Sequence, residues 1–234
     1  MSDRPTQPFH RALFALSATR GRIGASIRRK LARRRAPISV ADFETRLTRL
    51  TPQDICIDMG ANMGVMTELL AATGAQVHSY EPDPHCFAAL QKRFADRPNV
   101  HLHNVAIAAT SGSATLQRTR DFDKDPDAQS VGSTIAITDN ALYDPANTLQ
   151  VETRSFTDLL ECFDRPVAIV KMDIEGAEFP ILDQILATPE RFAIGALFVE
   201  THERFFPERL RFVKTLRQMN WDGTLPFPID TFWP

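Results

Sequence analysis

Short apolar segments alternate with amphipathic segments along most of this chain. Residues 167–173 are almost wholly apolar, as in a strand that is buried on both faces. The pattern predicts five strands, at residues 54–58, 75–81, 100–107, 167–173 and 195–200. It predicts helices at about residues 62–72, from Asp83-Pro84 onward and at residues 208–219. Strands that alternate with helices indicate an α/β fold, with a mostly parallel twisted sheet and helices on both faces.

One stretch interrupts this alternation. Residues 110–150 are rich in Asp, Ser, Thr and Gly, with one expected strand near residues 149–153. A long irregular stretch of this kind is usually functional or mobile. We interpret it as an insertion within a single domain of residues 37–234.

The charge is unevenly distributed. The formal net charge of the chain is −2, yet residues 1–35 carry ten Lys and Arg residues and one Asp, a formal +9. We interpret residues 1–36 as a basic arm, partly helical or disordered. The arm is expected to end at Ala36-Pro37, before a short helix near residues 40–50.

The arm has one apolar stripe. Ile23, Ile27 and Leu31 lie four residues apart between arginines. Such cationic helices lie on anionic membrane surfaces, so peripheral contact at the inner membrane face through residues 1–35 is one hypothesis. A solvated tail is the other. Interleaved aromatic residues and a recognisable nucleic-acid module are missing, so we expect no nucleic-acid partner.

Composition narrows the protein class. The apolar fraction of 43% and the charged fraction of 24% are ordinary for a soluble globular protein. The three cysteines form no CxxC pair, which argues against a disulfide framework or a zinc ribbon. No stretch reaches the ~18 apolar residues of a membrane span, and no secretory signal is recognisable, so we expect a cytoplasmic protein.

The first predicted strand ends in a glycine-rich turn that leads into a helix. Residues 58–64 read Asp-Met-Gly-Ala-Asn-Met-Gly. Glycines permit a tight turn and close approach of a ligand, and a helix amino terminus attracts an anionic group such as an amino-acid carboxylate. The second strand ends in Glu81, 21 residues after Gly60, where an acidic side chain can bind both hydroxyls of a ribose. Together these features predict a nucleoside site.

The glycine spacing disfavours a dinucleotide. The dinucleotide fingerprint requires glycines two and five residues after the first, where this chain has Asn62 and Val65. The GxxxG pattern found instead matches the loop that binds S-adenosylmethionine.

Three segments carry a family resemblance. They are residues 57–64, residues 80–84 and above all Val170-Lys-Met-Asp-Ile-Glu-Gly-Ala-Glu178. From about residue 50 to residue 202 the chain resembles the FkbM-type methyltransferases. The resemblance implies a Rossmann-like class I methyltransferase fold. It also implies methyl transfer from S-adenosylmethionine to a hydroxyl oxygen of a sugar, glycolipid or natural product.

The resemblance also implies a set of cofactor-binding residues. The methionine part is expected at the turn after the first strand, the ribose at Glu81 and the adenine at the end of the third strand. The implied residues are Asp58, Gly60, Ala61, Asn62, Gly64, Glu81, Asn104, Val105 and Ala106.

Four residues are candidates for the chemistry. A hydroxyl that is methylated must lose its proton, and a carboxylate or histidine can accept it. Asp173 ends the fourth strand, Glu175 and Glu178 follow it at i, i+3 spacing, and His202 comes just after the fifth strand. The two glutamates can instead simply favour a helix amino terminus, and a lone histidine is often structural. These carboxylates with His202 could hold a divalent cation, but no spacing compels it, so we predict no metal.

Three functions remain open. We expect an O-methyltransferase that acts on a small-molecule or glycan acceptor, although N-methylation is not excluded. A non-catalytic nucleoside-binding adaptor that docks through the basic arm is the main alternative. A nicotinamide-dependent oxidoreductase is the weakest, because the glycine fingerprint fails.

Overall fold

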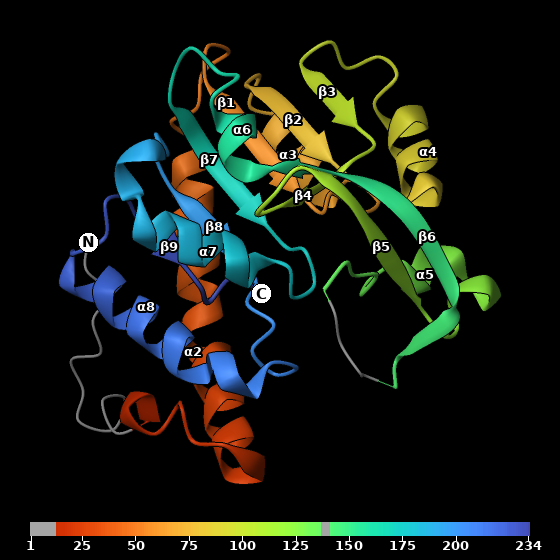
Figure 1. Cartoon of the computed structure of the whole chain (residues 1–234). Coiled ribbons are helices and arrows are strands. Elements are labelled where there is room, and N and C mark those ends of the chain that lie inside the picture. Colours follow the sequence, from red (N-terminus) through yellow and green to blue (C-terminus); the bar gives the residue numbers. More distant parts are fainter. Residues whose placement is uncertain (1–12, 137–140) are drawn as a thin grey trace.

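The main sheet determines where a ligand can bind. The computed structural model describes residues 13–136 and 141–234, so the first twelve residues of the predicted arm and residues 137–140 of the predicted insertion lie outside the described ranges. Six parallel strands lie in the order β3-β2-β1-β7-β8-β9 (Figure 1). They are β1 (Ile55–Met59), β2 (Gln76–Tyr80), β3 (Val100–His103), β7 (Val167–Met172), β8 (Leu197–Val199) and β9 (Ile229–Asp230). The strand order reverses between β1 and β7, and ligands bind at the carboxyl ends of strands at such a point.

Helices cover both faces of this sheet, as predicted. Helices α2 (Gly21–Leu47) and α3 (Val65–Ala71) lie on one face, and α6 (Phe156–Leu160), α7 (Glu178–Ala187) and α8 (Leu210–Asp222) pack on the other. Neighbouring residues of β1 point to opposite cores. Cys56 packs in a cluster with Phe43 of α2 and Leu70 of α3, whereas Ile57 packs in a cluster with Ile181 of α7. The predicted α/β fold is confirmed.

Helix α4 (Pro84–Arg93) begins as the sequence predicts. The Asp83 side chain accepts a hydrogen bond from the amide of His85, and Pro84 occupies the first turn. This cap satisfies one of the amides that a helix start leaves without a partner. The short helix also fixes the chain directly after Glu81.

The prediction of a single third strand at residues 100–107 is wrong. Strand β3 ends at His103, and β4 (Ala106–Ala108) pairs with β6 in a second sheet. Between them the Asn104 side chain donates hydrogen bonds to the carbonyl oxygens of Glu81, at 2.8 Å, and Pro82, at 3.0 Å. Such side-chain bonds to the backbone compete with a strand ladder, and here they coincide with the point where the chain leaves the main sheet.

The predicted insertion is mostly a long hairpin. Strands β5 (Gly112–Thr119) and β6 (Tyr143–Ser155) are antiparallel, and with β4 they form the second sheet in the order β4-β6-β5. The 3₁₀ helix η1 (Phe122–Lys124) and helix α5 (Pro126–Gln129) lie between the two strands in the sequence. The hairpin extends beside the main sheet (Figure 1). The strand expected near residues 149–153 is the end of the longer β6.

The basic arm is more structured than expected. Helix α2 continues through Pro37, so the predicted break at Ala36-Pro37 is wrong. Proline costs a helix one hydrogen bond, but its fixed φ suits the helix, and packing on both sides of Pro37 holds it. Leu31 is buried in a cluster with Trp221, and Phe43 is buried against the sheet, whereas Ile23 is 74% exposed. The division into an arm and a domain stays a prediction.

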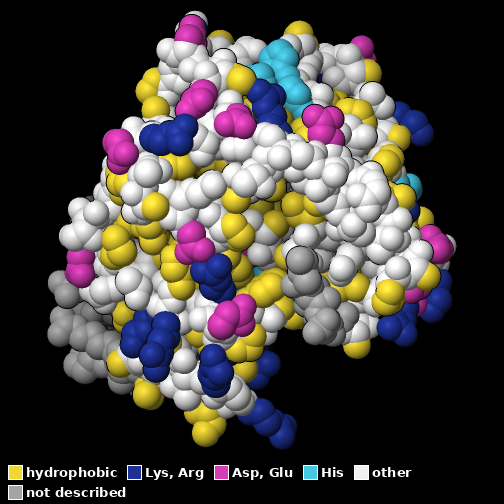
Figure 2. All heavy atoms as spheres, viewed as in Figure 1, with side chains coloured by type: hydrophobic (Ala, Val, Ile, Leu, Met, Phe, Trp, Pro, Cys, Tyr) yellow, Lys and Arg dark blue, Asp and Glu magenta, His cyan; other side chains and the backbone are white. Residues whose placement is uncertain are grey.

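Lys and Arg side chains gather at the lower end of the face in Figure 2, over α2 and α8. No helix within the described residues is both long enough and apolar enough to cross a membrane. Peripheral membrane contact through residues 1–35 stays a prediction. One residue of the apolar stripe, Leu31, is buried against the protein and does not face solvent.

Candidate active site

A cavity of about 430 Å³ lies at the carboxyl ends of β1, β2 and β7. This volume is in the range of small-ligand pockets. The insertion contributes Leu116 and residues 130–133 to the wall, and Trp233 forms another part. The crevice at the strand reversal is therefore roofed by the hairpin segment, a role that the sequence pattern alone did not indicate.

The nine predicted cofactor residues divide into two groups. Those that line the cavity are Gly60, Ala61, Asn62, Glu81 and Ala106. Those that are not part of its lining are Asp58, Gly64, Asn104 and Val105. Two residues of the second group support the first, because Lys171 links Asp58 to the carbonyl of Gly60 and Asn104 holds the backbone at Glu81.

Any side chain at either of two glycines in the turn after β1 would be strained. Gly60 has a φ of +77°, and a Cβ atom there would lie 1.8 Å from the carbonyl oxygen of Asp173. Gly64 has a φ of +83°, and its Cβ atom would lie 2.6 Å from the ring of Phe94. Left-handed backbone and missing space both exclude a side chain. The turn predicted to bind cofactor thus touches Asp173, one of the predicted catalytic residues.

Glu81 is a buried carboxylate with a defined orientation. One oxygen accepts a hydrogen bond from the amide of Asn62 and the other from the amide of Asp83, both at 2.8 Å. Burial raises the pKa of Glu81 to about 7, although the two amides act in the opposite direction. Each carboxylate oxygen has a further lone pair, so Glu81 can still accept hydrogen bonds from a ligand in the cavity.

Lys171 contacts both the turn after β1 and Asp173, and the sequence analysis did not identify it as a site residue. Its Nζ atom lies 3.6 Å from Asp58 Oδ1 and 3.5 Å from Asp173 Oδ2, and it donates a hydrogen bond to the carbonyl of Gly60 at 3.2 Å. Burial alone would lower the pKa of Lys171, but the carboxylates of Asp58 and Asp173 outweigh it and raise the pKa. A lysine within an otherwise apolar strand was the signal, because lysines are almost never fully buried unless paired.

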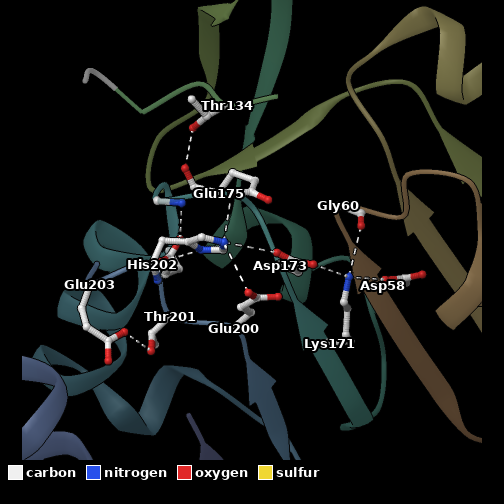
Figure 3. Close-up of polar contacts among 12 residues, drawn as sticks. Asp58, Gly60, Thr134, Lys171, Asp173, Glu175, Glu200, Thr201, His202 and Glu203 are labelled. Atoms are coloured by element: carbon white, nitrogen blue, oxygen red, sulfur yellow. Dashed lines mark hydrogen bonds and ion pairs between the residues drawn. The ribbon is translucent and has the colours of Figure 1, made fainter. Parts of the chain in front are cut away.

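The four predicted catalytic residues meet at the imidazole of His202, and Figure 3 shows Asp173 and Glu175 beside it. His202 Nε2 lies 3.0 Å from Glu175 Oε2 and 3.8 Å from Asp173 Oδ1, and His202 Nδ1 lies 3.3 Å from Glu178 Oε1. Glu200 also joins them, with Oε1 at 3.8 Å from His202 Nε2. The sequence placed Glu200 only in a strand, although its position two residues before His202 was the available signal.

The cluster has an inner and an outer part. His202 and Glu178 are fully buried, whereas Asp173 and Glu175 line the cavity. Burial alone would lower the pKa of His202, but Glu175 and Glu178 raise it to about 10. An imidazole that is already protonated at neutral pH cannot accept a proton. In this arrangement the group at the cavity that can accept one is a carboxylate.

The carboxylates respond to the same surroundings. Burial alone would raise the pKa of Glu175, but the His202 imidazolium outweighs it and the pKa is lowered. The pKa of Glu200 is raised by burial and by the nearby Asp173 carboxylate. Glu175 is stabilised in its charged form by the imidazolium, whereas the neighbouring carboxylates disfavour the charged form of Glu200.

A sequence model of the methyltransferase FkbM domain matches residues 58–220, more than half of the chain. The chain belongs to the FkbM methyltransferase family. Membership confirms the predicted family and the predicted cofactor, S-adenosylmethionine. All predicted cofactor-binding and catalytic residues of this FkbM methyltransferase lie within the matched range.

Curated relatives match a shorter stretch. The chain is 44% identical over 63 residues to the ribosomal RNA small subunit methyltransferase A of Thermotoga maritima, which is 27% of this chain and 23% of that protein. It is 36% identical over 64 residues to the protein of the same name from Pseudomonas syringae pv. tomato, which is 27% of this chain and 24% of that protein. The match spans about a quarter of these relatives.

Among solved structures, an rRNA methylase from Streptococcus thermophilus aligns over 74% of this chain and 76% of its own, at 12% identity and a TM-score of 0.42.

Proposed function

We propose that this FkbM methyltransferase transfers the methyl group of S-adenosylmethionine to a hydroxyl oxygen of a small-molecule or glycan acceptor. The observation that carries the proposal is the state of Asp173. This residue lines the cavity and touches the turn after β1, yet its Oδ1 atom is buried without a hydrogen bond to any described residue. A carboxylate oxygen held in this way is available to a hydroxyl group.

The residues present fit the cofactor. When bound, S-adenosylmethionine supplies an activated methyl group. The lone pairs left on Glu81 suit the two ribose hydroxyls, the turn at Gly60 and Asn62 suits the methionine part, and Ala106 suits the adenine edge. Val105 and Asn104 support this wall from outside the lining.

The chain then has two tasks during transfer. It must align the acceptor oxygen with the methyl group, and orientation of this kind contributes ~7–11 kcal/mol to a two-reactant step. It must also take the proton of the acceptor hydroxyl, which we assign to Asp173. Lys171, 3.5 Å from Asp173 Oδ2, holds this carboxylate in position.

Small-subunit ribosomal RNA is a second candidate acceptor. It is favoured by the names of the curated relatives, which include ribosomal RNA methyltransferases. The expectation of no nucleic-acid partner therefore needs its own test.

Methyl-labelled S-adenosylmethionine tests both candidates. The purified chain is incubated with hydroxylated sugars, with glycolipids or with small ribosomal subunits, and label is counted in each fraction. We expect label in a sugar or glycolipid fraction, lost in Asp173→Asn without loss of cofactor affinity. The exposed Asp164→Asn is the matched control and should keep full transfer.

Each alternative has its own result. Label in the ribosomal RNA would replace the first acceptor class with the second. Cofactor binding without transfer to any acceptor would support the adaptor hypothesis.

A further inference from the structure

The side chains of His202 and of two neighbouring carboxylates are close enough to bind one ion together. Asp173, Glu175 and His202 each offer one ligand atom, and these atoms all lie within 4.8 Å of one another. Asp173 follows β7, Glu175 lies in the loop before α7, and His202 follows β8, so three separate segments converge here (Figure 3). Carboxylates alone often gather without an ion, and a further observation is needed.

His202 provides that observation. The residue is 1% exposed, and its Nε2 atom, which points toward the carboxylates, makes no hydrogen bond with any described residue. The nearest carboxylate oxygen lies 3.0 Å away without the alignment of a hydrogen bond. A buried ring nitrogen left without a hydrogen bond is costly, and a metal ion at this position would bind it in place of its proton.

The second ring nitrogen of His202, Nδ1, lies beside a carboxylate, as it does in many metal-binding histidines. Glu178 Oε1 lies 3.3 Å from His202 Nδ1 and accepts a hydrogen bond from the His202 amide at 2.7 Å. Glu178 Oε2 accepts another from the amide of Gly176 at 2.7 Å. A carboxylate bonded to the far nitrogen of a metal-binding histidine fixes its tautomer and orientation. Glu178 is therefore a positioning residue, held in place by two backbone amides.

Glu175 is directed into the cluster by an unusual backbone. Its φ of 52° is left-handed, which a residue with a side chain rarely adopts. The hydroxyl of Thr134 in the insertion donates a 2.6 Å hydrogen bond to the carbonyl of Glu175. Strain of this kind concentrates at functional sites. The contact also joins the hairpin segment to the cluster.

We propose that Asp173, Glu175 and His202 bind one divalent cation at the wall of the cavity, with Glu200 close enough to assist. Two or three carboxylates and one imidazole combine hard oxygen ligands with a borderline nitrogen, a set that suits Mn²⁺. The sequence analysis predicted no metal, and this proposal replaces that prediction.

The cation would act on the acceptor. Asp173 and Glu175 line the cavity, so a hydroxyl in the acceptor position could contact the ion. Coordination lowers the pKa of a bound hydroxyl, as it does for metal-bound water. The O–CH₃ bond forms as the S–CH₃ bond breaks, and the hydroxyl proton leaves to the Asp173 carboxylate, as in the proposed methyl transfer. This role rests on the proposed methyl transfer, whereas binding of the ion does not.

The test is a Mn²⁺ titration of the full chain after dialysis against a chelator. Free Mn²⁺ is followed by electron paramagnetic resonance, which requires neither acceptor nor turnover. We expect one ion per chain, and affinity weakened at least about tenfold in Glu175→Gln and in Asp173→Asn, as even loss of a supporting residue costs 10–100-fold at metal sites. The exposed Glu208→Gln is the matched control and should bind as the parent does. Circular dichroism and cofactor affinity verify that each variant is folded.

The outcomes separate the two proposals. No Mn²⁺ binding by the folded parent, or unchanged binding in both cluster variants, would overturn the ion site and leave methyl transfer to be judged by its own assay. Mn²⁺ binding at the cluster in a protein that methylates no acceptor would support the ion site and contradict the proposed function.

Discussion

At the residue scale, Glu81 and His202 are both buried ionisable groups, but their surroundings act in opposite ways. Glu81 has two backbone amides and little opposite charge nearby, so burial dominates and raises its pKa to about 7. His202 has carboxylates on both ring nitrogens, so they dominate over burial and raise its pKa to about 10. Glu81 is therefore poised between charge states at neutral pH, whereas His202 is cationic when no metal ion is bound.

Cofactor affinity should increase with pH. Ribose hydroxyls donate to an ionised carboxylate, and the pKa of Glu81 is about 7, so S-adenosylmethionine should bind more tightly at about pH 8 than at about pH 6. Calorimetry across this range measures the change.

Two variants make this prediction specific. Glu81→Ala should weaken cofactor binding by about 1.5–3 kcal/mol, because a charged acceptor is lost. Glu81→Gln should remove the pH dependence, whereas the exposed Glu190→Gln should keep it. A parent protein with the same affinity at both pH values would contradict the role of Glu81.

His202 should make the fold less stable in alkali. Its pKa is raised from 6.5 to about 10 in the folded protein, so its stabilising effect is complete below about pH 6.5 and is lost as the pH rises to about 10. The melting temperature, measured with a chelator present, should fall over this range in the parent protein. In His202→Gln the fall should be smaller. Parallel curves for the two proteins would show that the imidazolium does not stabilise the fold.

The site residues differ in how visible they were in the sequence. The glycine turn, Glu81 and Asp173 were predicted because each ends a recognisable apolar strand. Lys171 lies inside β7, where a charge is recognised as functional only once its partners are known, and Glu200 directly follows β8. One partner of Lys171, Asp58, comes from a neighbouring strand across the β1–β7 pair.

At the scale of the secondary-structure elements, α2 shows that tertiary contacts can maintain a helix across a proline. Ala36-Pro37 predicted the end of the basic arm, but helix α2 continues through it because contacts before and after Pro37 hold the helix against the protein. The same limit applies to residues 100–107, where a strand pattern spans two sheets. The apolar pattern predicted β1 and β7 well because these strands are buried on both faces.

Leu31→Ala should destabilise the protein. Leu31 is 1% exposed and packs with Phe14, Trp221 and Phe232, so loss of its side chain leaves a cavity that costs about 2–5 kcal/mol. Ile23→Ala on the same helix is the matched control, because Ile23 is 74% exposed and should change stability little. Urea denaturation measures both. Equal stability of the two variants would mean that this part of α2 does not belong to the fold in solution.

At the scale of the whole molecule, the insertion and the main sheet form one site. Ser130 donates a hydrogen bond to the Asn62 side chain at 3.1 Å, and Thr134 donates one to the carbonyl of Glu175 at 2.6 Å. One contact reaches the cofactor side of the cavity and the other reaches the acceptor side. These contacts join residues distant in the sequence, so the composition of residues 110–150 indicated an insertion but not what it covers.

We infer that this cavity binds S-adenosylmethionine at the turn after β1 and at Glu81. The most direct test is parallel calorimetric titration of the purified chain with S-adenosylmethionine, S-adenosylhomocysteine and NAD. We predict that the two adenosyl ligands bind with one site per chain, that NAD does not, and that Glu81→Ala weakens both adenosyl ligands. A well-folded chain that binds neither adenosyl ligand, or that binds NAD instead, would contradict the account.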